Sequence, residues 1–118
     1  MVNLKACWHK SLNEIPKHHW KILAGNSINP FYKWEWLTSL EQSGSICSNK
    51  GWQPLHLALW RENCPIAVAP LYLKNHSYGE FIFDQVFAGL ANELGLNYYP
   101  KLLGMSPLSP VEGYQFLY

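Results

Sequence analysis

Two carboxylates are the side chains in this sequence whose type and spacing best suit chemistry. Glu80 and Asp84 flank the apolar stretch 81–83. On a β-strand, residues four apart point to the same face, so both carboxylates would lie on one face of a sheet. A carboxylate in such a place can take a proton from an amine or bind the amine as a cation. The spacing therefore predicts Glu80 and Asp84 as candidate general bases or amine ligands.

Asp84 also fits a purely structural interpretation. It stands just before Val86, Leu90 and Leu94, which recur at helical spacing. Aspartate is a preferred residue at the position that precedes a helix, where its side chain accepts from free backbone N–H groups. We favour this capping role for Asp84. The corresponding alternative for Glu80 is a place at a sheet edge.

Polar and aromatic residues around these carboxylates could bind a substrate. His76 and Tyr78 lie in a predicted turn, and loops carry functional residues more often than cores do. Tyr99 and Lys101 alternate onto one side of the last predicted strand, where they could hold a phosphate or carboxylate, although a lysine stem lying along the surface is the commoner case. Trp52 could line a glycan or peptide groove, and its alternative role is core packing.

The apolar periodicity predicts the elements that must position these residues. Helices are expected to begin at Pro16, at Asn29-Pro30 and at Gln85, and strands are expected over 2–8, 55–60, 66–73, 81–83 and 98–105. The order is strand, helix, helix, three strands, helix, strand, which indicates the α/β class with a mixed α+β sheet. Pro70 lacks a ladder donor, so it predicts an edge, a bulge or an opening of the sheet.

Composition excludes several classes of protein. The 118 residues suffice for one small domain, and nine Lys+Arg against eight Asp+Glu give a net charge of +1. The sequence has no cluster of excess basic residues, so DNA binding is not expected. The longest apolar run, 65–73, is far shorter than the about 20 residues that span a bilayer. Three cysteines cannot all pair with one another, and no metal-ligand spacing occurs. A cytoplasmic protein without a metal site is expected.

The last residues predict an incomplete fold. The segment 114–118 is aromatic and uncharged, whereas termini usually end in polar residues. A strand at this place would leave an open edge. We therefore expect residues 1–118 to be one partial domain, the first portion of a longer fold. The alternative is a short protein whose open sheet edge pairs with a second copy in a homodimer.

Several stretches of the sequence match a known pattern. They are Asn29–Phe31, Leu40–Gly44, Gly51–Leu57, Ala69–Asp84 and Tyr98–Leu103. The longest reads APLYLKNHSYGEFIFD and is specific. Together these stretches resemble the bacterial FemAB-like family, which is described as peptidoglycan biosynthesis or recognition proteins and grouped with GNAT-type N-acyltransferases. The resemblance runs from about Asn29 to Gly113.

The resemblance implies the N-terminal part of a GNAT-like domain. Full members of the family are similar to a tandem of two such domains. The implied activity is transfer of an acyl or aminoacyl group to an amine, with acyl-CoA or aminoacyl-tRNA as donor and a cell-wall precursor or other small molecule as acceptor. The chain lacks the second half, so we expect it to be inactive alone. The alternative is a non-catalytic recognition or assembly module, or a degenerate fragment of the family.

Overall fold

The computed structural model describes residues 3–25, 29–78, 80–81, 83–110 and 114–118. Within these ranges the strands are β1 (Leu4–His9), β2 (Trp52–Pro54), β3 (His56–Arg61), β4 (Cys64–Ala69), β5 (Tyr72–Lys74) and β6 (Lys101–Leu103). The α-helices are α1 (Lys17–Ala24), α2 (Trp34–Gln42) and α3 (Gln85–Glu93). Short 3₁₀ turns are η1 (Leu12–Glu14), η2 (Pro30–Tyr32) and η3 (Ser48–Lys50).

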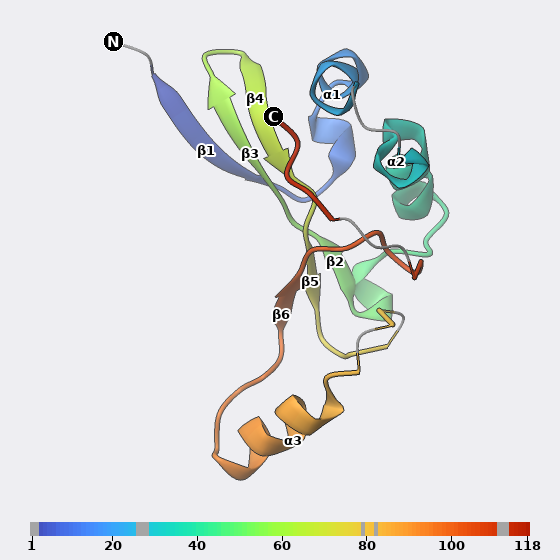
Figure 1. Ribbon diagram of the computed structural model, residues 1–118, viewed down its shortest axis with the longest axis vertical. Helices are drawn as coiled ribbons and strands as arrows, with labels where there is room; N and C mark the ends of the chain where they lie inside the picture. Colours follow the sequence, from blue (N-terminus) through green and yellow to red (C-terminus); the bar gives the residue numbers. More distant parts are fainter. Residues whose placement is uncertain (1–2, 26–28, 79, 82, 111–113) are drawn as a thin grey trace.

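The strands form two antiparallel sheets, one with the order β1-β3-β4 and one with the order β2-β5-β6. Figure 1 shows the two sheets joined end to end along the long axis of the molecule. With three α-helices beside them, the sheets confirm the predicted mixed α and β class. None of the described helices has the length or apolar character that a bilayer crossing requires.

A break in one long hairpin separates the sheets. Strands β3 and β4 pair with each other, and β2 and β5 continue the same hairpin beyond Leu55 and Pro70. At the break the Leu55 N–H still donates to the Leu71 carbonyl (2.9 Å), whereas the Leu71 N–H donates to the ring of His56 (3.1 Å). Pro70 lies where the first sheet ends and the second begins, directly after β4, which is an edge strand of the first sheet. The Val68 N–H points to the outer side of β4, where it donates to Leu117, and position 70 faces the same side. The structure therefore shows both an edge and an opening at Pro70, and the missing N–H takes no donor from the pairing with β3.

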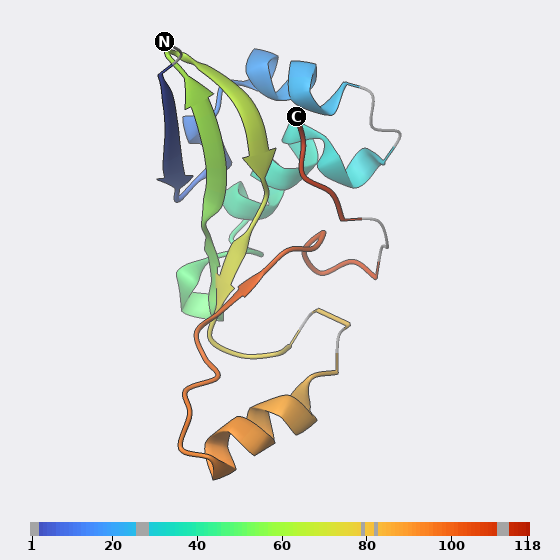
Figure 2. The same ribbon diagram turned by 60° about the vertical axis from the view of Figure 1, so that its left-hand side comes forward.

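The larger core lies between the first sheet and the helices α1 and α2. Figure 2 shows both helices on one side of that sheet, with the C-terminal segment beside β4. Val68 of β4 and Leu117 form an isolated antiparallel bridge, and both are buried. The buried Trp20 donates its indole N–H to the Tyr32 carbonyl (2.6 Å), which joins α1 to the turn before α2. The core members are Leu12, Ile15, Trp20, Tyr32, Leu37, Ala58, Val68 and Leu117.

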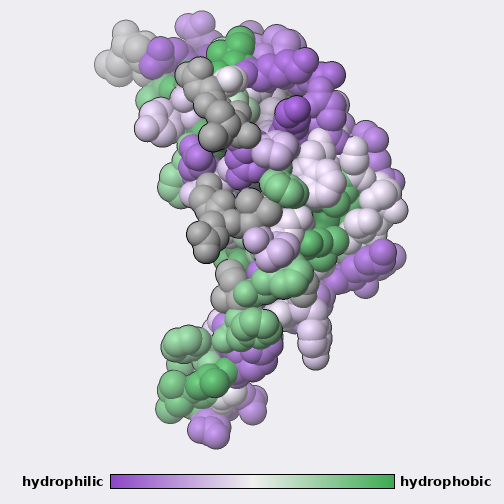
Figure 3. Space-filling model, turned by 45° about the vertical axis from the view of Figure 1, so that its right-hand side comes forward, coloured by the Kyte–Doolittle hydropathy of each residue, from purple (hydrophilic) through white to green (hydrophobic). Residues whose placement is uncertain are grey.

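Helix α3 lies at the far end of the long axis, away from this core (Figure 1). The predicted helix is confirmed, and Gly95 has a φ of +69°, the left-handed backbone that glycine adopts most readily. Its large apolar side chains are between 51% and 80% exposed, and Figure 3 shows hydrophobic atoms gathered at this end of the molecule. They are Val86, Phe87, Leu90 and Leu94.

The predicted strand over 81–83 is wrong for the residues that are described there. Phe81 has a φ of +58°, which no strand residue adopts, and neither Phe81 nor Phe83 pairs with a strand. Both phenylalanine side chains are exposed. Ile82, the third member, lies outside the described residues. Phe81 and Phe83 instead lie in irregular backbone between Glu80, whose carboxylate reaches the second sheet, and α3.

Candidate functional site

Two lysines and two carboxylates form a continuous network of ion pairs at the second sheet. Lys74 Nζ lies 2.7 Å from Glu80 Oε2, Lys101 Nζ lies 2.6 Å from Glu80 Oε1, and Lys101 Nζ lies 2.5 Å from Asp84 Oδ2. The side chains of Lys74 and Glu80 are completely buried, and those of Lys101 and Asp84 are 14% and 10% exposed. We call these four residues the ion-pair network. Its formal charges sum to zero.

The register of the second sheet explains why the network forms. Trp52, Lys74 and Lys101 occupy one row across β2, β5 and β6. Residues directly opposite each other share a face, and like charges in such a pair repel. Glu80 relieves this repulsion because each of its oxygens binds one lysine. On the other side of Lys74, the Trp52 ring lies 3.9 Å from the ammonium and adds a cation–π contact.

Charge and burial act in opposite directions on these groups. Burial by itself would raise the pKa of Asp84, but hydrogen bonds from Lys101 and Tyr98 outweigh it and hold that pKa well below the usual range. Burial would lower the pKa of Lys101, but its bonds to Asp84 and Glu80 outweigh burial and raise it. For Lys74 burial dominates and lowers the pKa. Asp84 and Lys101 are therefore firmly charged at neutral pH.

The capping role favoured for Asp84 is wrong for its side chain. Asp84 does occupy the position before α3, but its carboxylate makes no capping hydrogen bond. Oδ2 instead accepts from Tyr98 Oη (2.6 Å) and from Lys101. Its other oxygen, Oδ1, is buried and has no hydrogen-bond partner within the described ranges. The likewise buried Glu80 does not stand at an exposed sheet edge.

His76 holds the loop that carries Glu80. Its Nδ1 accepts from the Tyr78 N–H (3.0 Å), so Nε2 carries the proton and donates to the Lys50 carbonyl (2.7 Å). The Tyr78 carbonyl in turn accepts from Lys74, while the Tyr78 ring is exposed. Both nitrogens of His76 are thus engaged with backbone, which gives this histidine a positioning role in the geometry.

We expect Gly51→Ala to destabilise the protein by about 1–3 kcal/mol. Gly51 has a φ of +74°, and an added Cβ would lie 2.5 Å from the His76 ring. The measurement is urea unfolding followed by tryptophan fluorescence. In the double variant with His76→Ala the ring is absent, so the part of the destabilisation that comes from the steric clash should disappear. The part that comes from a positive φ at alanine should remain. If Gly51→Ala unfolds at the wild-type midpoint, the contact between Gly51 and His76 is not tight.

Three residues complete the surroundings of the network. Ser77 Oγ accepts from Lys101 (3.0 Å) and hydrogen bonds with Tyr99 Oη (2.5 Å). Tyr98 reaches Asp84, as described above. Of the predicted site residues, Glu80, Asp84 and Lys101 are in direct contact, Tyr99 joins through Ser77, and Trp52 joins through Lys74. His76 and Tyr78 lie in the adjoining loop.

Sequence reasoning missed Lys74, Ser77 and Tyr98. Lys74 carried a usable signal, since a lysine at the end of the apolar run 65–73 must neutralise or expose its charge. Ser77 and Tyr98 are sequence neighbours of residues that were predicted for the site, His76 and Tyr99. Their roles depend on hydroxyl directions that spacing along the chain does not encode.

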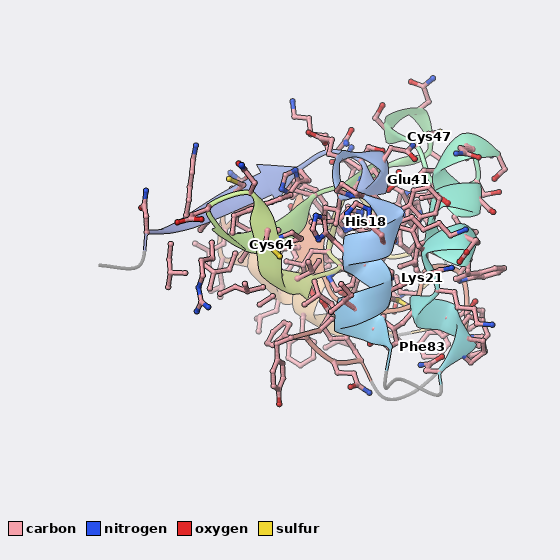
Figure 4. All side chains as sticks on the ribbon, turned by 90° about the horizontal axis from the view of Figure 1, so that it is seen from above. His18, Lys21, Glu41, Cys47, Cys64 and Phe83 are labelled. Atoms are coloured by element: carbon pink, nitrogen blue, oxygen red, sulfur yellow. The ribbon has the colours of Figure 1, made fainter. Side chains whose placement is uncertain are left out.

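A second buried polar cluster joins α2 to the first sheet. Glu41 accepts from Ser11 Oγ (2.8 Å), from the Leu12 N–H (3.1 Å) and from His56 Nε2 (3.2 Å). Figure 4 shows Glu41 between α2 and the blue segment that precedes α1. Since His56 Nδ1 accepts from Leu71, Glu41 acts through His56 on the break in the hairpin.

The amino-acid sequence matches one known protein family. The sequence profile of the FemAB-like family, described as peptidoglycan biosynthesis/recognition, matches residues 11–118. The match takes in every strand except β1, and it includes all four members of the ion-pair network. A search of curated proteins found no match, and a search of solved structures found none. Since the family profile extends over nearly the whole sequence, this chain belongs to the FemAB-like family.

Proposed function

We propose that this chain is the acceptor-binding part of a GNAT-type N-acyltransferase of the cytoplasm. The complete enzyme would transfer an acyl or aminoacyl group from acyl-CoA or aminoacyl-tRNA to an amine of a peptidoglycan precursor. In that reaction the amine nitrogen bonds to the acyl carbon, the bond to the donor's leaving group breaks, and the proton on nitrogen passes to a base. Family membership supports the link to peptidoglycan, and the break between the two sheets at Leu55 and Pro70 supports the GNAT-like domain.

Asp84 carries the proposal. Its side chain is nine-tenths buried and charged, and its buried Oδ1 has no hydrogen-bond partner in the described part of the chain. A buried carboxylate oxygen without a donor is costly, and an ammonium group would supply that donor. With a pKa held well below its usual range, Asp84 is a good ligand for a cationic amine and a poor acceptor of its proton.

The candidate bases at this site are already engaged. Both oxygens of Glu80 bind lysines, both nitrogens of His76 bind backbone, and His56 is fully buried. None is free to take the proton from an attacking amine. We therefore propose that the isolated 118-residue chain binds the acceptor amine and shows no turnover with acetyl-CoA.

Nuclear magnetic resonance titration tests amine binding directly. We expect Nα-acetyl-lysine to shift the Asp84 and Tyr98 signals, and Nα,Nε-diacetyl-lysine, which lacks the ammonium, to leave them unchanged. Since the pKa of Asp84 is lowered, binding should persist as the pH falls from 7 to below 3.8, the ordinary pKa of an aspartate. Asp84→Asn should abolish the preference, and Glu93→Gln, which removes an exposed carboxylate, should keep it. Equal binding of the two probes would contradict the proposal, and so would turnover by the isolated chain.

A second candidate function is a non-catalytic recognition or assembly module. The exposed apolar side of α3 favours it, because large apolar patches on a surface commonly mark interaction sites. Strand β1 also forms an edge of its sheet and exposes Leu4 and Trp8, which suits pairing with a second copy. Light scattering after size exclusion distinguishes a homodimer from a monomer.

A further inference from the structure

A hollow lies between α3 and the segment 96–99, beside the ion-pair network. Its volume is about 480 Å³, which falls within the range of small-molecule sites. The residues that line it come from two walls. They are Ala88, Gly89 and Asn92 on α3, and Leu96, Asn97, Tyr98 and Tyr99 on the segment that leads to β6.

The sequence of α3 keeps this hollow open. At 100° per residue, Ala88, Gly89 and Asn92 share one side of the helix, while Phe87 and Leu90 lie on the opposite side. The small residues thus face the hollow and the large apolar ones face away. A Cβ built on Gly89 would meet no other atom within 4 Å. A helix that simply covered segment 96–99 would place its large apolar side chains there instead.

The walls offer ring faces and free amides. The Tyr98 hydroxyl donates to Asp84 and the Tyr99 hydroxyl bonds with Ser77, so both rings are fixed in place. Their ring centroids are 5.0 Å apart in an edge-to-face arrangement, and the Lys101 ammonium lies over one face of each ring, 5.7 and 5.8 Å from the two centroids. No described residue hydrogen bonds to the side-chain amides of Asn92 and Asn97. Fixed aromatic rings with nearby amides suit a ligand that has an apolar ring face and hydroxyl groups at its rim.

The charges around the hollow exclude an anionic ligand. No charged side chain lines it. Lys101, the nearest cation, has three N–H donors, and Ser77, Glu80 and Asp84 accept from all three. No donor of Lys101 remains for a phosphate or carboxylate.

We propose that the hollow between α3 and segment 96–99 is a subsite for an uncharged sugar ring. This inference rests on the proposed function for its place in the acceptor: Tyr98 links the hollow to Asp84, so a sugar bound here lies beside the amine that Asp84 holds. The ring packs on the tyrosine faces, and its hydroxyl groups bond with the two asparagine amides.

Titration of the full chain with methyl N-acetyl-β-glucosaminide tests the subsite. We expect shifts confined to α3 and residues 96–99. Gly89→Leu places a large side chain on the wall of the hollow, where the space at the Cβ position is open, and should raise the Kd at least about tenfold. Val86→Leu, an exposed position outside the hollow, should leave it unchanged. Tyr99→Phe keeps the ring face and should bind the sugar, whereas Tyr99→Ala should lose it.

Each outcome decides one proposal. Absence of sugar binding, or equal affinity in the wild type and Gly89→Leu, overturns the subsite. Binding of uridine in preference to the glucosaminide would assign the hollow to a nucleobase and also overturn it. Because the probe has no amine, its binding does not depend on Asp84 acting as an amine ligand. Sugar binding without any preference for the ammonium of Nα-acetyl-lysine would therefore retain the subsite and reject the proposed function.

Discussion

Glu80→Gln is expected to destabilise the fold by about 3–5 kcal/mol, the usual cost of removing one partner from a buried ion pair. Glu80 binds two lysines, and the side chain of Lys74 is completely buried. Without the carboxylate, two lysines that face each other across β5 and β6 would repel, and the Lys74 side chain has no access to water. Urea unfolding of the two proteins, followed by tryptophan fluorescence, gives the difference.

Two further variants separate charge from packing. The double variant Lys74→Met with Glu80→Leu removes both charges of the buried pair and should recover most of the lost stability, because apolar replacements of buried ion pairs are commonly tolerated. Glu93→Gln removes an exposed carboxylate of α3 and should not change the midpoint. A wild-type midpoint for Glu80→Gln would show that Lys74 reaches solvent in the folded protein.

The ion-pair network also shows where prediction from sequence ends. The chemistry of Glu80, Asp84 and Lys101 was visible from residue type and position. The ion pairs among them could not be predicted, because they depend on the strand register that sets Lys74 opposite Lys101. Register is a relation between strands that the alternation within one strand does not specify.

The error at residues 81–83 has a related cause. Alternating phenylalanines favour a strand, but such preferences span only about 1 kcal/mol. A path that kept Glu80 away from Lys74 would leave a buried charge unpaired, which costs several times more. The loop therefore takes the path that brings Glu80 to Lys74 and Lys101, and Phe81 adopts a left-handed backbone to allow it. The two helices with strong stop signals, which end near Gly44 and Gly95, were predictable because those signals are local.

Glu41→Ala should cost about 3 kcal/mol or more, since it leaves three donors without their acceptor. Leu12 and His56 are fully buried, so water cannot replace the lost bonds there. Glu35→Ala, on the exposed face of the same helix, is the matched control and should not change the unfolding midpoint, because Glu35 pairs with the exposed Lys17 at the surface, where ion pairs contribute little. Glu41→Gln keeps one acceptor and should fall between the two.

Hydrogen exchange identifies the cause of that loss. If Glu41 acts through His56, its removal lets the ring turn, and the Leu71 N–H loses its acceptor at the break between β4 and β5. The Leu71 amide should then exchange faster in Glu41→Ala under conditions where the Val68 amide, held by Leu117, keeps its protection. Equal acceleration at both amides would indicate general destabilisation. Faster exchange at Leu71 alone would show that a carboxylate on α2 maintains the opening at Pro70, at the start of β5, the strand that ends at Lys74 of the ion-pair network.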